Sequence, residues 1–392
     1  MREHSMPPLS ISPTQETPKI AGVIQCKNEW GLIALSIGFA LIHHVDEVFV
    51  LNDGSNDETH LGLKHLQEIW PGRIHVFNQS GGRFFQEAQI NTLVQLARQG
   101  DPDWIYVFDA DEFLISKNGQ SLKEHLKSLP QECKAIRYEL RNFVSLREFN
   151  DQSLSDFQKI DRQGVVDESR HRNTLESYEE IYQGRLNFFH RPFPSKVIFR
   201  NEAFLRVAAG SHNVHYQMNA PFYPTDNFYA AHLSWLSRER LRRKAEQGRQ
   251  HVTNGFPRRH GWQNQLIFQM ANENRLDQLW ERHSLPEPGQ PREDSPRNVV
   301  ENPDFRTAIQ TTVQSLVQAG FDPENLCIYK SEVIPRMEAP PSYFQFQTLV
   351  ALTSQHHQSL DLTATPNPVS RFFQRLRRSI LKRLPGGRSR LY

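Results

Sequence analysis

Three carboxylates lie within four positions in the stretch YVFDADEF, residues 106–113, at the end of the apolar run WIYVF. Asp109, Asp111 and Glu112 would repel one another in a buried cleft, and this repulsion is costly unless a positive charge offsets it. Either the cluster faces water as an ordinary loop, or a cation lies between the carboxylates. Because Asp109 and Asp111 flank one small residue, both can reach a common ion, and hard oxygen ligands favour Mg²⁺ or Mn²⁺.

Polar residues also follow three earlier apolar runs, at residues 27–29, 53–57 and 81–83. In a parallel sheet the carboxyl ends of the strands lie at one edge, where ligands collect. We therefore expect these turns to converge with the acidic cluster on one site. The candidate ligand-binding residues in them are Lys27, Asn28, Glu29, Asp53, Asp57 and Arg83.

The elements that must position these turns alternate along the first 115 or so residues. Short apolar runs of strand length are followed by helix-length stretches at residues 31–42, 59–69 and 87–100. This alternation predicts an α/β fold with a parallel sheet. The stretch DWIYVFDADEF, residues 103–113, is expected to form the fourth strand. Irregular runs from 134 to about 235 predict antiparallel strands with a polar insertion at 150–185, so the whole sheet should be mixed.

The net charge of +2 hides a division between the body and the last 24 residues. Residues 369–392 hold eight Lys and Arg side chains and no acidic one, which leaves 38 basic against 44 acidic residues elsewhere. A nucleic-acid-binding protein would spread basic charge over its fold, so we expect no nucleic acid partner. The predicted organisation is a disordered extension at 1–18, the α/β domain at 19–235, a helical extension at 236–330, a Pro-, Ser- and Gln-rich linker at 331–368 and a basic amphipathic tail helix at 369–392.

The turns resemble a known family. The strings KNE (27–29), DGSNDET (53–59) and DADEF (109–113) resemble family 2 glycosyltransferases with the GT-A fold, in a bacterial branch with KNE and DxDEF motifs. The resemblance continues through the segments SKVIFR and AHLSWLSRERLRRKAEQG to about residue 250. It implies a Rossmann-like mixed sheet flanked by helices. It also implies a nucleotide-sugar donor, with UDP- or GDP-linked sugars expected, and a divalent cation.

The resemblance implies roles for individual residues. Asp109 and Asp111 would bind the metal and the diphosphate, and Asp53 and Glu29 would contact the nucleoside. His212 lies where such enzymes often supply a metal ligand. The branch commonly continues with His-Tyr where this chain has His232 and Leu233, so His232 is a weaker candidate. A catalytic base is not assigned by any short motif, although Asp226 and Glu168 lie in predicted loops.

Two functions from different classes follow. The first is a metal-dependent transferase moving a sugar to a glycan, lipid-linked or protein acceptor, in surface polysaccharide synthesis. The alternative is a catalytically inactive GT-A-fold binding protein or membrane-tethered scaffold that acts through its basic tail. The start of the chain lacks a signal-peptide pattern and only three cysteines occur, without a CxxC pair, so a reducing, cytoplasmic location is expected.

The tail is predicted to be an amphipathic helix. In VSRFFQRLRRSILKRL, apolar residues at Val369, Phe372, Leu376 and Ile380 follow helical spacing, and basic residues lie along a different face. One interpretation is a terminal helix packed on the acidic body. The other is an interfacial helix on the inner face of the membrane, with its cations on anionic lipid.

Overall fold

The computed structural model describes residues 17–79, 86–167, 173–202, 204–216, 222–259, 261–287 and 298–326. The predicted extension at 1–18 falls almost wholly outside these ranges, and the predicted linker and tail helix at 331–392 lie entirely outside them. None of the helices in the described ranges is both long enough and apolar enough to span a bilayer.

The described strands are β1 (Ile20–Cys26), β2 (Glu47–Asp53), β3 (Ile74–Gln79), β4 (Trp104–Val107), β5 (Glu112–Ser116), β6 (Ala135–Val144), β7 (Arg162–Gly164), β8 (Lys196–Arg200), β9 (Phe204–Val207), β10 (Val214–Tyr216), β11 (Phe222–His232) and β12 (Val299–Glu301). The helices are α1 (Trp30–His43), α2 (Thr59–Ile69), α3 (Gln86–Ala97), α4 (Leu122–Ser128), α5 (Leu154–Phe157), α6 (Thr174–Tyr182), α7 (Arg238–Thr253), α8 (Trp262–Asn272), α9 (Leu276–His283) and α10 (Asp304–Gln318).

One large mixed sheet organises the chain, with the order β12-β7-β6-β8-β4-β1-β2-β3 and with β11 and β5 pairing off this path. β1 runs parallel to both β2 and β4, and β2 runs parallel to β3. β8 is antiparallel to its neighbours β4 and β6, whereas β11 is parallel to β6. The predicted fold class, a mixed α/β sheet flanked by helices, is confirmed.

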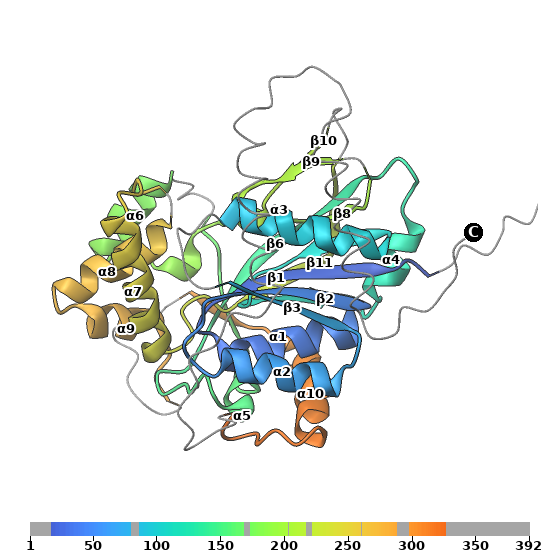
Figure 1. Ribbon diagram of the computed structural model, residues 1–392. Coiled ribbons are helices and arrows are strands. Elements are labelled where there is room, and N and C mark those ends of the chain that lie inside the picture. The colour runs from blue at the N-terminus through green and yellow to red at the C-terminus, as the bar shows by residue number, and fades with distance from the viewer. Residues whose placement is uncertain are drawn as a thin grey trace, which may run out of the picture.

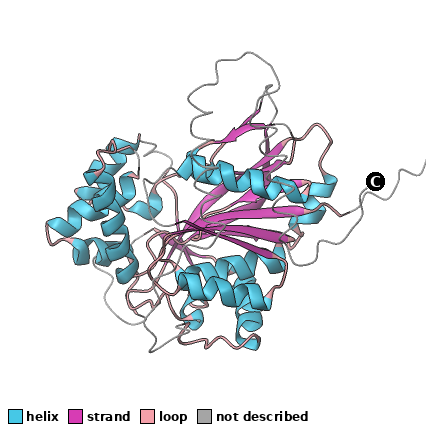
Figure 2. Cartoon of the chain, in the orientation of Figure 1, coloured by secondary structure: helices cyan, strands magenta, loops and turns pink. Residues whose placement is uncertain are grey.

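Helices cover both faces of the parallel half of the sheet (Figures 1 and 2). Side chains alternate along β1, where Ile20 and Ile24 face the core formed with α1, and Ala21 and Val23 face the core formed with α3. Burial on both faces explains why these strands are continuous apolar runs rather than alternating ones. α1 is buried throughout residues 30–41, because the sheet lies on one side of it and α2 and α10 pack on others.

Residues 103–113, which were predicted to form the fourth strand, are divided into two strands in the structure. β4 ends at Val107, a turn closed by the Glu112 N–H donating to the carbonyl of Asp109 (3.1 Å) follows, and β5 starts at Glu112. The turn redirects the chain, so that β5 pairs antiparallel with β11 instead of continuing β4. The acidic cluster therefore lies between two strands rather than beyond the end of one.

The predicted extension at 236–330 contributes to two separate cores. α7, α8 and α9 pack with α6 in an aromatic cluster that includes Trp235 and Phe188, stacked at 4.1 Å between ring centroids. Figure 1 shows this bundle beside the sheet. α10 instead returns to the main core and packs against α1. The domain boundaries themselves stay a prediction.

His44, next to α1, gives the fold a pH dependence that can be measured. Its Nε2 lies 2.7 Å from the carbonyl of Leu114, and its Nδ1 is buried without a hydrogen-bond partner in the described part of the chain. Protonation would therefore add a donor that has no acceptor. Burial, reinforced by His43, lowers the pKa of His44 from 6.5 to about 3.

Since the unfolded chain binds more protons between these two values, stability is full above pH 6.5 and falls as the pH drops toward 3. At pH 5 the loss from this one group is about 2 kcal/mol. We expect His44→Gln to remove that share of the difference in unfolding free energy between pH 7 and pH 5, measured by urea denaturation. His65→Gln, at a partly exposed position on α2, should change the difference much less, and an equal effect of both would contradict the assignment.

Candidate active site

The turns after β1 and β2 are joined by direct hydrogen bonds. The Asn28 N–H donates to the Ser55 hydroxyl (2.9 Å), and the Asn56 N–H donates to the side-chain oxygen of Asn28 (2.8 Å). Asn28 adopts a left-handed conformation with φ of 55°, which asparagine tolerates better than most residues. The first two predicted turns therefore lie side by side at the carboxyl edge of the sheet.

Asp57 and Asp53 from the second turn have different surroundings. The Asp57 carboxylate accepts from the N–H groups of Thr59 (3.0 Å) and Trp30 (3.5 Å), so it holds the first turns of two helices. Asp53 is 3% exposed and accepts a long hydrogen bond of 3.4 Å from Gln89. Burial raises the pKa of Asp53, which indicates a carboxyl group that gains from a hydrogen-bonding ligand.

Asp111 lies in a buried network with two cations from α7. Arg240 joins Glu29 (2.8 Å) to Asp111 (3.0 Å), and the Lys244 ammonium lies 3.4 Å from the same Asp111 oxygen. Burial opposes ionisation of Asp111, but Lys244 and Arg240 overcome it and hold the pKa well below its usual range. Burial raises the pKa of Glu29 in spite of the pairing with Arg240.

A third cation, the buried Lys196 of β8, bridges the other two carboxylates of the cluster. Its ammonium lies 2.7 Å from Asp109 and 2.9 Å from Glu112, and its side chain is 1% exposed. Burial disfavours the charged lysine, yet Asp109 and Glu112 raise its pKa above the ordinary value. Burial raises the pKa of Glu112 to about 8, although Lys196 opposes the shift. One oxygen of Glu112, Oε2, is buried and has no hydrogen-bond partner among the described residues.

His232, at the end of β11, completes a group of three metal-ligand side chains. One ligand atom each from Asp111, Glu112 and His232 lies within 4.8 Å of the others, and all three residues are buried. The side-chain amide of Asn142 donates to the carbonyl of Phe189 (3.3 Å), so its oxygen faces His232 Nδ1 at 2.8 Å. Nδ1 therefore donates and Nε2 keeps its lone pair, as in many metal-binding histidines. Burial keeps this ring neutral by lowering its pKa to about 4.

This donor set fits a divalent cation. Two carboxylates and one neutral imidazole suit Mn²⁺, and the unpartnered Oε2 of Glu112 is a buried acceptor that a cation would satisfy. The predicted set differs, since Asp109 pairs with Lys196 and His212 lies with Nδ1 3.2 Å from the carbonyl of Ser195. Neither Asp109 nor His212 belongs to the group of three. Burial lowers the pKa of His212 to about 4, so it too is neutral.

The remaining predicted residues lie elsewhere or outside the described ranges. Arg83 and Glu168 fall among the residues that the structure does not describe. Asp226 is exposed on β11, six residues from His232, which at the spacing of a strand is about 20 Å. This separation does not favour Asp226 as a catalytic base. Lys27 is partly buried beside the first turn, where its charge lowers the pKa of Asp53 against the larger effect of burial.

Sequence reasoning missed the three cations of the site, of which Lys196 and Arg240 are buried and Lys244 is partly buried. Arg240 and Lys244 are one helical turn apart on α7 and share a face with the buried Leu241 and Gly248. A basic pair at i, i+4 beside an apolar stripe is a weak signal that both charges face inward. Lys196 opens the apolar strand KVIFR, and nothing in that run distinguishes it from an exposed strand end.

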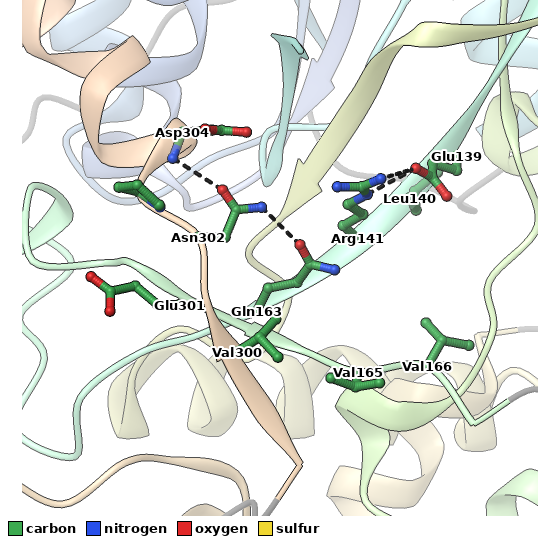
Figure 3. Close-up of a pocket in the computed structure, with 11 residues that line it drawn as sticks. Glu139, Leu140, Arg141, Gln163, Val165, Val166, Val300, Glu301, Asn302 and Asp304 are labelled. Atoms are coloured by element: carbon green, nitrogen blue, oxygen red, sulfur yellow. Dashed lines mark hydrogen bonds and ion pairs between the residues drawn. The ribbon is translucent and has the colours of Figure 1, made fainter.

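A separate cavity of about 640 Å³ lies between β6, β7, β12 and the start of α10. Figure 3 shows the side chains that line it. Their polar groups pair with one another, since Asn302 donates to Gln163 (2.8 Å) and Arg141 donates to Glu139 (2.8 Å). None of the carboxylates of the acidic cluster lines this cavity, so we place the candidate active site at the cluster.

The N-terminal part of the chain matches a known protein family. Residues 23–133 match the model of the family described as Glycosyl transferase family 2. No curated protein matches the chain in sequence. Among solved structures, S. aureus TarS 1-349 is 12% identical, with 77% of this chain and 80% of that chain covered and a TM-score of 0.31.

Two further solved structures were found. A mannosyltransferase from Pyrobaculum calidifontis, in complex with GDP-Man and Mn²⁺, is 12% identical, with 91% and 92% of the chains covered and a TM-score of 0.34. Glucosyl-3-phosphoglycerate synthase from Mycobacterium tuberculosis, in complex with Mn²⁺ and UDP-glucose, is 15% identical, with 32% and 44% covered and a TM-score of 0.21.

The family match and the geometry coincide. The matched segment runs from β1 to just before β6, and it contains the turns after β1, β2 and β4 that meet at the acidic cluster. It supplies Glu29, Asp53, Asp109, Asp111 and Glu112, while His232 and the three cations come from the chain beyond it. Residues 23–133 therefore match the glycosyl transferase family 2 model over the segment whose turns carry the acidic cluster.

Proposed function

We propose that the enzyme transfers a sugar from a UDP- or GDP-linked donor with the help of a bound Mn²⁺ or Mg²⁺. The observation that carries the proposal is the group formed by Asp111, Glu112 and His232 at the edge of the sheet where the turns of the family 2 domain meet. A divalent cation held there would supply positive charge to the diphosphate of the donor. The acceptor that fits the family is a glycan, a lipid-linked sugar or a protein, in surface polysaccharide synthesis.

The residues of the chain would act as follows. Asp111, Glu112 and His232 would hold the metal, and Asn142 would fix the His232 ring through the Nδ1 hydrogen bond. Lys196 would hold two neighbouring carboxyl groups, Asp109 and Glu112, close together. In the predicted set, Asp109 and His212 would complete the metal shell instead of Glu112 and His232. Both sets share Asp111, so it is the ligand on which the proposal depends most.

Donor binding is assigned to the turns after β1 and β2. We propose that Asp53 accepts a hydrogen bond from the ribose or base. Its carboxyl group is buried, burial raises its pKa, and it accepts only a long hydrogen bond from Gln89. The other proposed donor-binding residues are Lys27, Asn28, Glu29, Asp57, Arg83 and Asp109. Among these, Glu29 and Asp57 already have protein partners, so their contacts to a donor would be added to existing ones.

Calorimetric titration with UDP and GDP, with and without Mn²⁺, tests the function together with Asp53. The wild type should bind one nucleoside diphosphate more tightly with Mn²⁺. Asp53→Ala should weaken that binding about tenfold to hundredfold, since it removes a hydrogen bond to a charged group. Turnover at saturating donor should change less, because the contact is shared by ground and transition states.

The matched control for this experiment is Asp226→Ala, at an exposed position on β11. It should bind nucleotide like the wild type. A wild type that binds no nucleoside diphosphate would favour the inactive scaffold instead. A large loss of turnover in Asp53→Ala with unchanged donor affinity would give Asp53 a different role.

We further propose that residues 369–392, which lie outside the described ranges, attach the enzyme to anionic membrane. Their sequence alone supports this, through an apolar stripe and eight basic residues without an acidic one. Each Lys or Arg near the surface contributes roughly 1 kcal/mol, so attachment should be firm at low salt and weak at high salt.

The full chain should therefore co-sediment with anionic vesicles at low salt, and a chain ending at Asn367 should not. A full chain with Arg371, Arg375, Arg378 and Lys382 changed to Gln separates charge from the apolar stripe and should also stay in solution. Equal sedimentation of all three chains, or of none, would leave a tail packed on the body as the better interpretation.

A further inference from the structure

Helix α7 begins beside the candidate metal site and carries two cations into it. Arg240 and Lys244 lie one turn apart, and both contact the same oxygen of Asp111, Oδ2. The start of the helix is fixed, because the Ser237 hydroxyl accepts from the Arg240 N–H (3.0 Å) and donates to Asp151 (3.1 Å). The positive end of a 16-residue helix therefore points toward the site, which favours a negatively charged ligand there.

The two cations differ in how completely they are bonded. The Arg240 guanidinium has short contacts to Glu29 (2.8 Å) and Asp111 (3.0 Å), and its side chain is 4% exposed. Lys244 has only long contacts in the described part of the chain, 3.4 Å to Asp111 and 3.3 Å to the Ser234 hydroxyl. An ammonium has three donors, and good hydrogen bonds to oxygen are about 2.7–3.2 Å long. Lys244 therefore has donor capacity left over.

A purely structural role explains Arg240 better than it explains Lys244. Arg240 already neutralises Asp111 at close range, so a second cation on the same oxygen, on a side chain only 13% exposed, adds a desolvation cost with little attraction in return. The charge balance of the site points the same way. Three cations already lie at the site, and a divalent cation would add further positive charge, which a negatively charged ligand would offset: Lys196, Arg240 and Lys244.

We propose that the Lys244 ammonium contacts the diphosphate of the donor and stabilises it as it leaves, while Arg240 positions Asp111 and Glu29. The proposal rests on the proposed function. In the transfer, an acceptor hydroxyl oxygen bonds to the anomeric carbon as the bond from that carbon to the diphosphate oxygen breaks. The electron pair of the broken bond stays on the diphosphate, whose negative charge rises by one, and the hydroxyl proton passes to a base or to water. Lys244 supplies positive charge where this negative charge develops.

Nucleoside diphosphates and monophosphates distinguish this role from a structural one. The experiment compares the affinities for UDP and UMP, and for GDP and GMP, in the presence of Mn²⁺ by calorimetry. In the wild type the diphosphate should bind more tightly than the monophosphate. Lys244→Gln, which keeps a hydrogen-bonding side chain but removes the charge, should reduce this preference about tenfold to hundredfold. Lys244→Arg should retain most of it, and kcat for transfer should follow the same order.

The control lies on the same helix. Arg242 has a 56% exposed side chain and pairs with Glu239 on the surface, so Arg242→Gln should keep the wild-type preference. Lys244→Met serves as the second uncharged variant should the glutamine variant fold poorly, and thermal unfolding checks both.

The experiment distinguishes a wrong proposed function from a wrong role for Lys244. If the wild type binds neither diphosphate, the proposed function is wrong and the role of Lys244 is rejected with it. If the wild type binds diphosphate and the uncharged variants lose affinity for diphosphate and monophosphate equally, Lys244 is a structural residue and only the present inference is wrong.

Discussion

Asp111→Asn should lower the rate of sugar transfer by roughly three orders of magnitude, the largest effect on activity that we expect from one substitution. Asp111 is the residue common to both proposed metal-ligand sets, and its charge also holds Arg240 and Lys244 at the site. Asparagine keeps the shape of the side chain but removes the negative charge that both the metal and the cations need. The measurement is kcat at saturating donor and Mn²⁺.

The same substitution should also destabilise the fold. From the sequence alone, with Asp111 taken as a metal ligand, we predict that Asp111→Asn leaves folding nearly unchanged. In the structure Asp111 is buried between two cations, and removing one member of such a buried ion pair costs about 3–5 kcal/mol. Activity must therefore be measured where the variant is still folded, as judged by its circular dichroism. Near-wild-type turnover of a folded variant would exclude Asp111 as a metal ligand.

Lys196→Met should cause a loss of stability as large as that of Asp111→Asn. Lys196 is the buried cation between Asp109 and Glu112, and without it two carboxylates approach each other with no charge to offset them. We expect a loss of about 3–5 kcal/mol in unfolding free energy at pH 7, measured by urea denaturation. The loss should be similar at pH 5 and larger at pH 9, because the carboxyl of Glu112, whose pKa burial raises to about 8, gives up its proton and becomes charged only above that value.

Lys117→Met is the matched comparison for this prediction. Lys117 also pairs with a glutamate, Glu139, at 3.1 Å, but that pair is half exposed. Exposed ion pairs contribute at most about 1 kcal/mol, so this variant should lose little stability at any of these pH values. A loss for Lys196→Met no larger than for Lys117→Met would mean that the buried pair adds nothing to the free energy of folding.

The sequence predicts the parallel half of the sheet well, and the reason is local. β1 and β2 are buried on both faces, so their apolar runs are continuous, and the polar residues 27–29 and 53–57 mark where they end. α1 was predictable from its length and its apolar residues. Residues 103–113 were predicted to be one strand because apolar residues lie on both sides of the acidic turn. Only the pairing of β5 with β11 shows that a second strand begins after the turn.

The composition of the site was less predictable, because it depends on contacts between distant segments. Glu112 faces His232 through the register of β5 and β11, across a separation of 120 positions that no local pattern encodes. Arg240 and Lys244 reach Asp111 from a helix that follows the matched family segment by more than 100 residues. The acidic turn itself was visible in the sequence, whereas the cations that pair with it were not.

The position of α10 has a consequence for how the chain matures during its synthesis. The Trp30 indole donates to the carbonyl of Leu326 (2.8 Å), 296 positions later, and α10 covers a helix that is apolar on every side. Ribosomes add roughly 5–20 residues per second, so α1 leaves the ribosome roughly 15–60 seconds before the segment that covers it. During that interval the nascent chain exposes an apolar helix to water or to a chaperone. Shortening the chain before residue 304 would make this transient state permanent, and the product should aggregate.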